Sequence, residues 1–203
     1  MRVETNRSEC RYTQTMSRFW LVLSLATVSG WSFAQTISKE QWESADRQVR
    51  RLRPAAFTQL PKNLIAELQR RGCTIPQVSV IEGLQNVIKG EFAKPGQTDW
   101  AVLCSIGRVS SILVFWNGSE TNVAEVAKAK DVDRLQGWGG DKIIYDWAIS
   151  PVGKDFIMDR YKGFGGEKPP PIDHQGINDA VVGKASVVLY FYKGKWLRLQ
   201  GDD

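Results

Sequence analysis

Apolar residues follow two different periods along this chain, and the change falls near Gly72. Ahead of that position the spacing is that of a helix, about three to four residues. One apolar stripe follows a capping-box sequence that begins at Ser38, and a second follows Pro61. The stripes consist of Trp42, Ala45, Val49 and Leu52 in the first segment and of Leu64, Ile65 and Leu68 in the second. The pattern predicts two helices, the first stopped by Pro54 and the second capped by Gly72.

Beyond Cys73 the apolar residues come in short runs rich in Val, Ile, Leu and aromatic side chains, which are typical of strands. Turn-forming residues such as Gly96 and Gly107 separate them. The runs cover residues 86–92, 99–106, 109–116, 143–149, 155–161, 185–192 and 196–199. The stretch 100–104 is apolar at nearly every position, which predicts a strand covered on both faces. Residues 121–142 carry no pattern that assigns them.

This order of elements predicts an α+β fold. Two N-terminal helices pack on a mainly antiparallel β-sheet, which is built from a meander and a C-terminal hairpin. The hairpin follows from Lys193, Gly194 and Lys195, which form a short turn between two apolar runs. We expect a single domain over residues 35–203, with a helical arm over 35–72 and a β-rich part over 73–203.

A separate apolar run, residues 19–28, stands close to the N-terminus. Arg18 precedes it, and the small residues Ser32 and Ala34 follow it at the spacing of a signal-peptide cleavage site. The run is too short for a bilayer, which needs about 20 apolar residues. The pattern predicts a signal peptide over residues 1–34, with translation starting at Met1 or at Met16. The mature protein is then periplasmic or secreted and has no transmembrane segment.

Cys73 and Cys104 are the two cysteines beyond the predicted cleavage site. An isolated pair in a small exported domain is typically bridged, so we predict a structural disulfide. Without residues 1–34 the chain has 23 Lys plus Arg and 20 Asp plus Glu, a net charge of +3, which is too small to favour nucleic acid as a partner. Six arginines of the helical arm either form a solvated face or meet an acidic envelope surface: Arg47, Arg50, Arg51, Arg53, Arg70 and Arg71.

Residues 90–103 contain a Gly-Glu-Phe start, a tight loop and an aspartate ahead of an apolar strand, and they resemble a degenerate FG-GAP or VCBS-type repeat. The family's loop carries several acidic calcium ligands, of which only Asp99 remains in this chain. The resemblance therefore implies a turn and a strand without a calcium site, and we expect no metal or other cofactor. With Cys73, Pro76 and the closing Gly-Lys-Trp sequence, the wider pattern is similar to exported bacterial proteins of unknown function. This resemblance implies that the protein is located in the cell envelope.

Candidate chemistry is sparse. His174, the single histidine, is flanked by Asp173 and followed by Asp179, and it is either a general base oriented by a carboxylate or a polar residue of a proline-rich loop. Trp116 and Trp138 lie beside turns, where an indole face either stays open for a sugar, peptide or cation or fills the core. Glycoside hydrolysis needs one carboxyl group as an acid and another as a nucleophile. The carboxylates that could supply such a pair are Glu91, Asp99, Asp141, Asp146, Asp155 and Asp173. Asp131, Asp133 and Asp141 lack the ligand spacing of a calcium loop.

No motif of a hydrolase, zinc enzyme or nucleotide-binding protein occurs in the sequence. We therefore favour a non-enzymatic binding or interaction module of the cell envelope, with a glycan, peptide or protein as its partner. The candidate ligand-binding residues are Trp116, Trp138, Asp173 and His174. Two alternatives stay open: a small wall-glycan hydrolase that uses two carboxylates, and a periplasmic inhibitor that blocks a lytic enzyme with the loop 164–171. The sequence does not indicate an oligomeric state.

Overall fold

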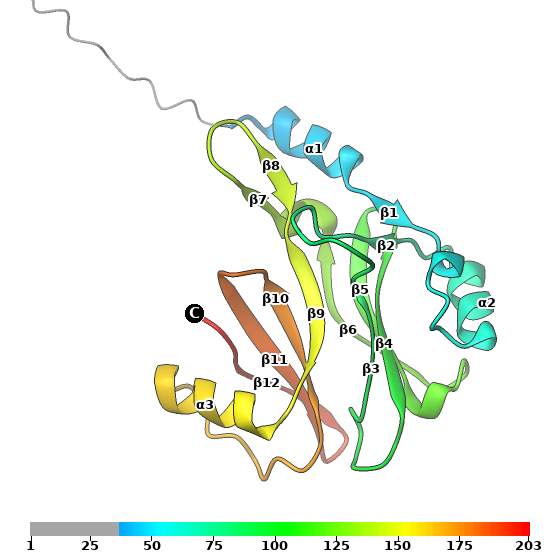
Figure 1. The fold of residues 1–203 in the computed structure, drawn as a ribbon, viewed down its shortest axis with the longest axis vertical. Coiled ribbons are helices and arrows are strands. Elements are labelled where there is room, and N and C mark those ends of the chain that lie inside the picture. Colours follow the sequence, from blue (N-terminus) through cyan, green and yellow to red (C-terminus); the bar gives the residue numbers. More distant parts are fainter. Residues whose placement is uncertain (1–36) are drawn as a thin grey trace, which may run out of the picture. The chain divides into compact units, whose positions relative to one another are not determined.

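Two four-stranded antiparallel sheets form the framework of the protein, which the computed structural model describes over residues 37–203 (Figure 1). The first sheet has the order β3-β4-β5-β6 and the second the order β12-β11-β10-β9. Their strands are β3 (Val87–Gly90), β4 (Asp99–Ile106), β5 (Val109–Phe115), β6 (Val123–Lys130), β9 (Trp147–Val152), β10 (Gly176–Val181), β11 (Ala185–Tyr192) and β12 (Lys195–Gln200). The predicted signal peptide, residues 1–34, lies outside the described residues.

Helices and two small sheets surround this framework. The helices are α1 (Lys39–Gln48), α2 (Lys62–Arg70) and α3 (Lys154–Phe164), with three 3₁₀ turns, η1 (Pro54–Ala56), η2 (Trp116–Gly118) and η3 (Asp131–Arg134). The small sheets pair β1 (Arg51–Leu52) with β2 (Ile75–Pro76) and β7 (Leu135–Gly137) with β8 (Ile143–Tyr145). Among residues 37–203, each helix is too short or too polar to cross a bilayer.

The hydrophobic core has three parts, one on each outer face of the framework and one between the sheets. Helix α2 lies beside the first sheet and α3 beside the second (Figure 1). Leu64 and Leu68 of α2 pack on one face of β4 and β5, and Ile157 of α3 packs against β11 and β12. Between the sheets, Leu103 and Ile112 of the first sheet meet Ile177 and Leu189 of the second. Strand β4 is therefore covered on both faces, which confirms the prediction for residues 100–104.

The α+β class is confirmed, and the expected single sheet is wrong. The chain forms four sheets and adds a third helix, α3, late in the chain. The strand predicted over residues 155–161 is part of α3. Phe156, Ile157 and Met158 form a short apolar run of the kind found in strands, but packing of Ile157 on the second sheet favours a helix at this position. In the unassigned segment 121–142 the chain forms β6, η3 and β7.

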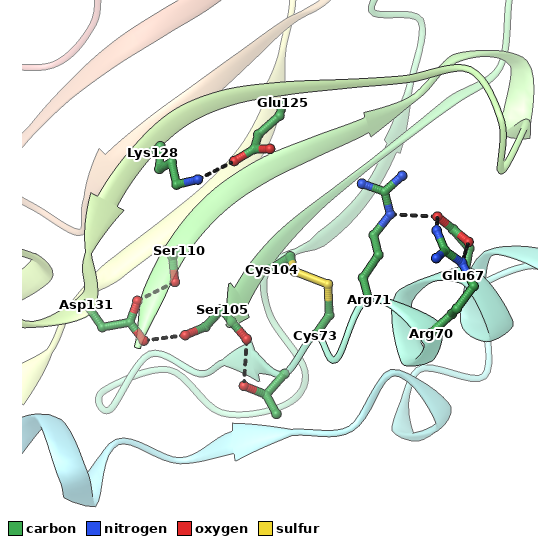
Figure 2. Close-up of a disulfide and its surroundings, with 11 residues drawn as sticks. Glu67, Arg70, Arg71, Cys73, Cys104, Ser105, Ser110, Glu125, Lys128 and Asp131 are labelled. Atoms are coloured by element: carbon green, nitrogen blue, oxygen red, sulfur yellow. Dashed lines mark hydrogen bonds and ion pairs between the residues drawn. A yellow bond between two sulfur atoms is a disulfide. The ribbon is translucent and has the colours of Figure 1, made fainter. Parts of the chain in front are cut away.

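The predicted disulfide is confirmed. Cys73 follows the end of α2, and its sulfur is bonded to that of Cys104 in β4, with 5.2 Å between the two Cα atoms (Figure 2). Both cysteines are buried in the core part beneath α2. Next to the bridge, Glu67 accepts hydrogen bonds from Arg70 and Arg71 (Figure 2). The covalent link therefore holds the helical arm on the first sheet.

The turn of residues 92–98 is organised by Asp99. This carboxylate is fully buried and accepts hydrogen bonds from the backbone N–H groups of Phe92, Ala93 and Asn117 at 2.8 to 2.9 Å. The side chain of Gln97 donates a fourth at 2.7 Å. Asp99 thus ties the turn to η2, and its oxygens are occupied by protein donors.

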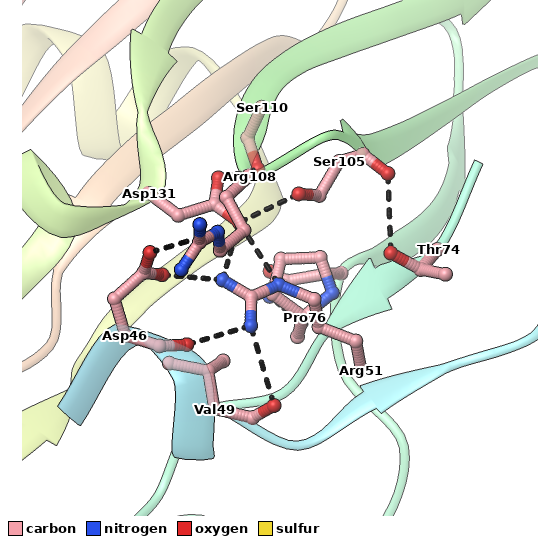
Figure 3. A network of polar contacts seen from close by, with 10 residues as sticks. Asp46, Val49, Arg51, Thr74, Pro76, Ser105, Arg108, Ser110 and Asp131 are labelled. Carbon is pink, nitrogen blue, oxygen red and sulfur yellow. Dashed lines mark hydrogen bonds and ion pairs between the residues drawn. The ribbon is translucent and has the colours of Figure 1, made fainter. Parts of the chain in front are cut away.

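A buried ionic network attaches α1 to the first sheet. Arg51 donates to Asp131 through Nε and Nη2 at 3.0 and 2.7 Å, and its Nη2 also contacts Asp46 at the end of α1 (Figure 3). The hydroxyls of Ser105 and Ser110 donate to the same Asp131, which is fully buried. Burial lowers the pKa of Arg51, but its hydrogen bonds to the two carboxylates outweigh burial and raise it above its usual range.

Candidate functional site

A cleft opens where β6 and η3 face the inner side of the second sheet. It consists of two adjoining hollows of about 150 and 200 Å³, and Trp147, Asp179 and Arg198 line both of them. In the sheet register Trp147 lies opposite Val181, and Val181 lies opposite Ala185. Paired residues of neighbouring strands point to the same face, so these side chains form one wall of the cleft.

The opposite wall carries a buried cation. Arg134 of η3 is only 2% exposed, and its Nη1 donates to Asp179 Oδ1 at 3.3 Å. Its Nη2 donates to the backbone carbonyl of Ala127 at 2.6 Å, and its guanidinium carbon lies 4.5 Å from the centre of the Trp147 ring. The Nε of Arg134 has no acceptor among the described residues. Arg134 therefore holds both a carboxylate and an indole in place.

Asp179 is the centre of this arrangement. The carboxylate is 6% exposed, and its Oδ1 accepts from the Trp147 Nε1–H at 2.5 Å as well as from Arg134. No hydrogen bond joins Oδ2 to another residue of the described chain. A buried carboxylate of fixed orientation at the surface of a cleft is suited to bind a hydrogen-bond donor or a cation.

The backbone of the cleft wall is also unusual. Ala127 has a φ of 53°, and the pairing of β5 with β6 shifts register beside it, between Ser110 and Ile112. A left-handed backbone is costly for alanine and requires support from its surroundings. The bulge turns the Ala127 carbonyl toward Arg134, so the strained residue is part of what positions the buried cation.

Three larger hollows lie elsewhere on the described chain. The hollow between α1 and β8 measures about 420 Å³ and is lined mostly by uncharged side chains, with Asp141 and Lys142 at its hairpin end. A second, of about 410 Å³, is lined by Cys104 and Ile106 beside α2, and a third, of about 350 Å³, lies beside Arg108. We place the candidate site in the inter-sheet cleft, although it is smaller, because a buried ion pair and an indole converge there.

The two tryptophans predicted as open aromatic faces differ in their surroundings. Trp138 lies at the β7–β8 turn and is 52% exposed. Trp116 is partly buried, stacks on Trp196 with 5.6 Å between ring centres and lies 4.9 Å from Phe191. Its packing is that of a core residue, whereas Trp138 keeps an open face. A ligand at either residue stays a prediction.

His174 and Asp173 lie in the loop ahead of β10. The His174 ring stacks on Tyr190 with 4.3 Å between ring centres and is 8% exposed. Its Nε2 lies 3.8 Å from Asp173 Oδ1, and the Tyr190 hydroxyl donates to the same oxygen at 3.2 Å. Burial raises the pKa of Tyr190. None of the four predicted ligand-binding residues lines the five hollows described, and the structure does not bring them together in one site.

The carboxylates weighed for catalysis are scattered in the same way. Asp99 is occupied by four donors, and Asp146 is buried, with its pKa raised by burial. Asp131 binds Arg51 and two serines, apart from the exposed Asp133. Within residues 37–203, no three His, Cys, Asp or Glu side chains gather as metal ligands would.

The helical arm does not present six free arginines. Arg51 is partly buried and engaged in the ionic network, and Arg70 and Arg71 are paired with Glu67 at 2.7 Å. Arg47 in the last turn of α1, Arg50 just after this helix and Arg53 ahead of η1 are exposed. The hypothesis of a basic surface therefore concerns fewer side chains than the sequence indicated.

The sequence pattern did not group the residues of the cleft into one site. Asn178 and Asp179 interrupt an otherwise apolar six-residue strand, and this was the available signal for Asp179. Arg134 lies in a segment whose pattern assigned no element, and Trp147 was counted only as part of an apolar run. No family model matches the chain, and no curated protein or solved structure shows significant similarity to it.

Proposed function

We propose that this protein is an exported, non-enzymatic binding module of the cell envelope, which holds a small ligand in the inter-sheet cleft. The observation that carries the proposal is the Arg134–Asp179–Trp147 cluster. The ion pair between Arg134 and Asp179 lines the cleft and is largely shielded from water. Such a pair loses solvation without adding much to stability, so a role in ligand recognition accounts for its presence. A disulfide and a predicted signal peptide support an address in the periplasm or outside the cell.

The first test is equilibrium dialysis of the purified protein against the low-molecular-mass fraction of an envelope extract, followed by mass spectrometry of the retained compounds. The variant Ala185→Phe fills the cleft without removing a charge, because Ala185 lines its wall. Ala66→Phe, on the exposed side of α2, is the matched control. We expect the wild type and Ala66→Phe to retain the same compound unchanged, and Ala185→Phe to lose it.

Two outcomes contradict the proposal. Equal retention by Ala185→Phe places the ligand outside the cleft. Consumption of a wall glycan, with loss of turnover in Asp133→Asn and Asp179→Asn, favours the hydrolase, since both carboxylates line the cleft.

The inhibitor alternative rests on a different feature, the half-exposed Phe164 at the end of α3. It predicts that the protein slows a wall-lytic enzyme and that Phe164→Ser abolishes the effect while leaving retention by the cleft intact. An inhibition assay with a purified wall-lytic enzyme measures this directly.

A further inference from the structure

The cleft has an aliphatic half and a charged half. In the smaller hollow Val181, Ala185 and Val187 lie beside Trp147, and the wall is mainly apolar. This hollow, about 150 Å³, is several times the roughly 30 Å³ that one water molecule occupies in the liquid, so it holds a branched aliphatic side chain. The adjoining hollow is lined by side chains of both charges, namely Lys128, Asp133, Arg134, Asp179 and Arg198. A ligand that fills both is amphipathic.

Asp179 defines what binds on the acidic side. Its Oδ1 is used by Arg134 and Trp147, whereas Oδ2 has no hydrogen-bond partner among the described residues. A carboxylate that is 6% exposed needs further donors to offset the loss of water. An ammonium group supplies them, since it carries three N–H donors and a compensating charge.

Arg198 defines the basic side. It is exposed, lines both hollows and forms no ion pair within residues 37–203. Lys128, by contrast, is already 3.4 Å from Glu125. The guanidinium fork of an arginine matches the two oxygens of a carboxylate. The free cation of the cleft is thus placed to bind an anionic group of the ligand.

We infer that the ligand is a small zwitterion, an α-amino acid with an apolar side chain. Its ammonium group binds Asp179, its carboxylate binds Arg198, and its side chain packs against Val181, Ala185 and Val187. The inference rests on the proposed function, since it names the ligand class of the same cleft. An acidic sugar fits less well, because it offers hydroxyls in place of the cation and has no aliphatic branch for the smaller hollow.

The test is calorimetric titration of the purified protein with leucine and with four compounds that each change one feature. N-acetyl-leucine lacks the ammonium charge, leucinamide lacks the carboxylate, glycine lacks the side chain, and glucuronate represents acidic sugars. We expect leucine to bind with a Kd of roughly 10 μM to 1 mM, as befits a ligand of few atoms. Each change is expected to weaken binding about tenfold or more, since each removes a charged contact or an apolar one.

Two substitutions assign the contacts. Asp179→Asn should weaken leucine about tenfold but leave the weak binding of N-acetyl-leucine unchanged, because that compound has no ammonium to lose. By the same reasoning Arg198→Gln should weaken leucine and leave leucinamide unaffected. Arg53→Gln, exposed in the segment before η1, is the matched control and should bind leucine as the wild type does. If Asp179→Asn does not fold, Ala185→Phe removes leucine binding without altering a charge.

Failure of this inference is distinguishable from failure of the proposed function. Absence of leucine binding, or tighter binding of glucuronate, overturns the zwitterion even when dialysis still recovers a compound that Ala185→Phe fails to retain. If leucine binds equally well to the wild type, Ala185→Phe and Arg198→Gln, the amino acid lies outside the cleft. This result also overturns the inference of a zwitterionic ligand. The loss of cleft-dependent retention of every compound removes the binding function itself.

Discussion

Arg51 joins two carboxylates that lie 85 positions apart in the chain, Asp46 and Asp131. Replacing Arg51 by Met leaves the fully buried Asp131 without its cation, and we expect a loss of about 3 to 5 kcal/mol in the free energy of unfolding. Denaturant unfolding measures the loss. Arg53→Met, at an exposed position two residues on, should stay within about 0.5 kcal/mol of the wild type.

A cost below about 1 kcal/mol for Arg51→Met would contradict the role of this network. The double variant Arg51→Met with Asp131→Asn should be less destabilised than the sum of the two single variants, because the charge that Arg51→Met leaves unpaired is then absent. The guanidinium and the carboxylate act as one unit that attaches α1 to the first sheet.

At Asp99, hydrogen-bond donors of the protein occupy the carboxylate oxygens, which in acidic calcium loops bind the metal ion. We expect thermal melts in EDTA and in calcium to coincide, because the four hydrogen bonds to Asp99 leave its oxygens occupied. Asp99→Ala should cost about 3 kcal/mol or more, since it strands buried backbone donors. Asp133→Ala, at an exposed position, is the control. A rise of several degrees with calcium that Asp99→Asn abolishes would contradict this account.

At the scale of elements, Glu67 makes the contribution of the end of α2 to stability depend on pH. Hydrogen bonds from Arg70 and Arg71 lower the pKa of Glu67 from its ordinary 4.5 to about 2. A carboxyl group whose pKa falls on folding stabilises the native state fully above pH 4.5, and this contribution disappears as the pH falls toward 2. Glu67→Gln should therefore flatten the acid side of the stability profile in that interval.

The measurement is the midpoint of urea unfolding between neutral pH and pH 2. Glu82→Gln, in the exposed loop ahead of β3, should leave the profile unchanged. If Glu67→Gln and the wild type lose stability in parallel, the arginine contacts of Glu67 do not persist in solution. Because the Arg70 side chain is 71% exposed, high salt should shrink the difference between the two proteins.

The disulfide acts on the same helix. It joins residues 31 positions apart, so its removal is expected to cost about 3 to 4 kcal/mol, mainly through the freedom of the unfolded chain. Intact mass with and without reductant establishes the bridge in solution, and the melting temperature of Cys73→Ser with Cys104→Ser measures its effect. Two alkylatable thiols in the unreduced protein would contradict the bridge.

Individual strands were predictable because their apolar runs are local in sequence. Residues 99–106 and 185–192 became β4 and β11 with the expected bounds. The division into two sheets was not predictable. An apolar run that is covered on both faces does not indicate whether a helix or a second sheet covers each face. Helix α3 was missed because the short apolar run of Phe156, Ile157 and Met158 is compatible with a strand as well as with a helix.

At the scale of the whole molecule, the candidate site exists only after the two sheets are stacked. Arg134, Trp147 and Asp179 come from η3, β9 and β10, and no sequence spacing relates them. Asn178 and Asp179, the two polar residues inside β10, were the local sign, since strand interiors beside a core are normally apolar. The position of Trp138 was predictable, since it lies at a turn and is half exposed.

The central claim is that the inter-sheet cleft is a ligand site, and the side-chain N–H of Trp147 reports on it directly. This group donates to Asp179 inside the cleft, so its ¹H–¹⁵N signal responds to any ligand that contacts that carboxylate. We predict a saturable shift of the Trp147 signal on addition of the compound retained in dialysis, and no shift in Ala185→Phe. A bound ligand that leaves the Trp147 signal unmoved while shifting that of Trp138 would contradict the account.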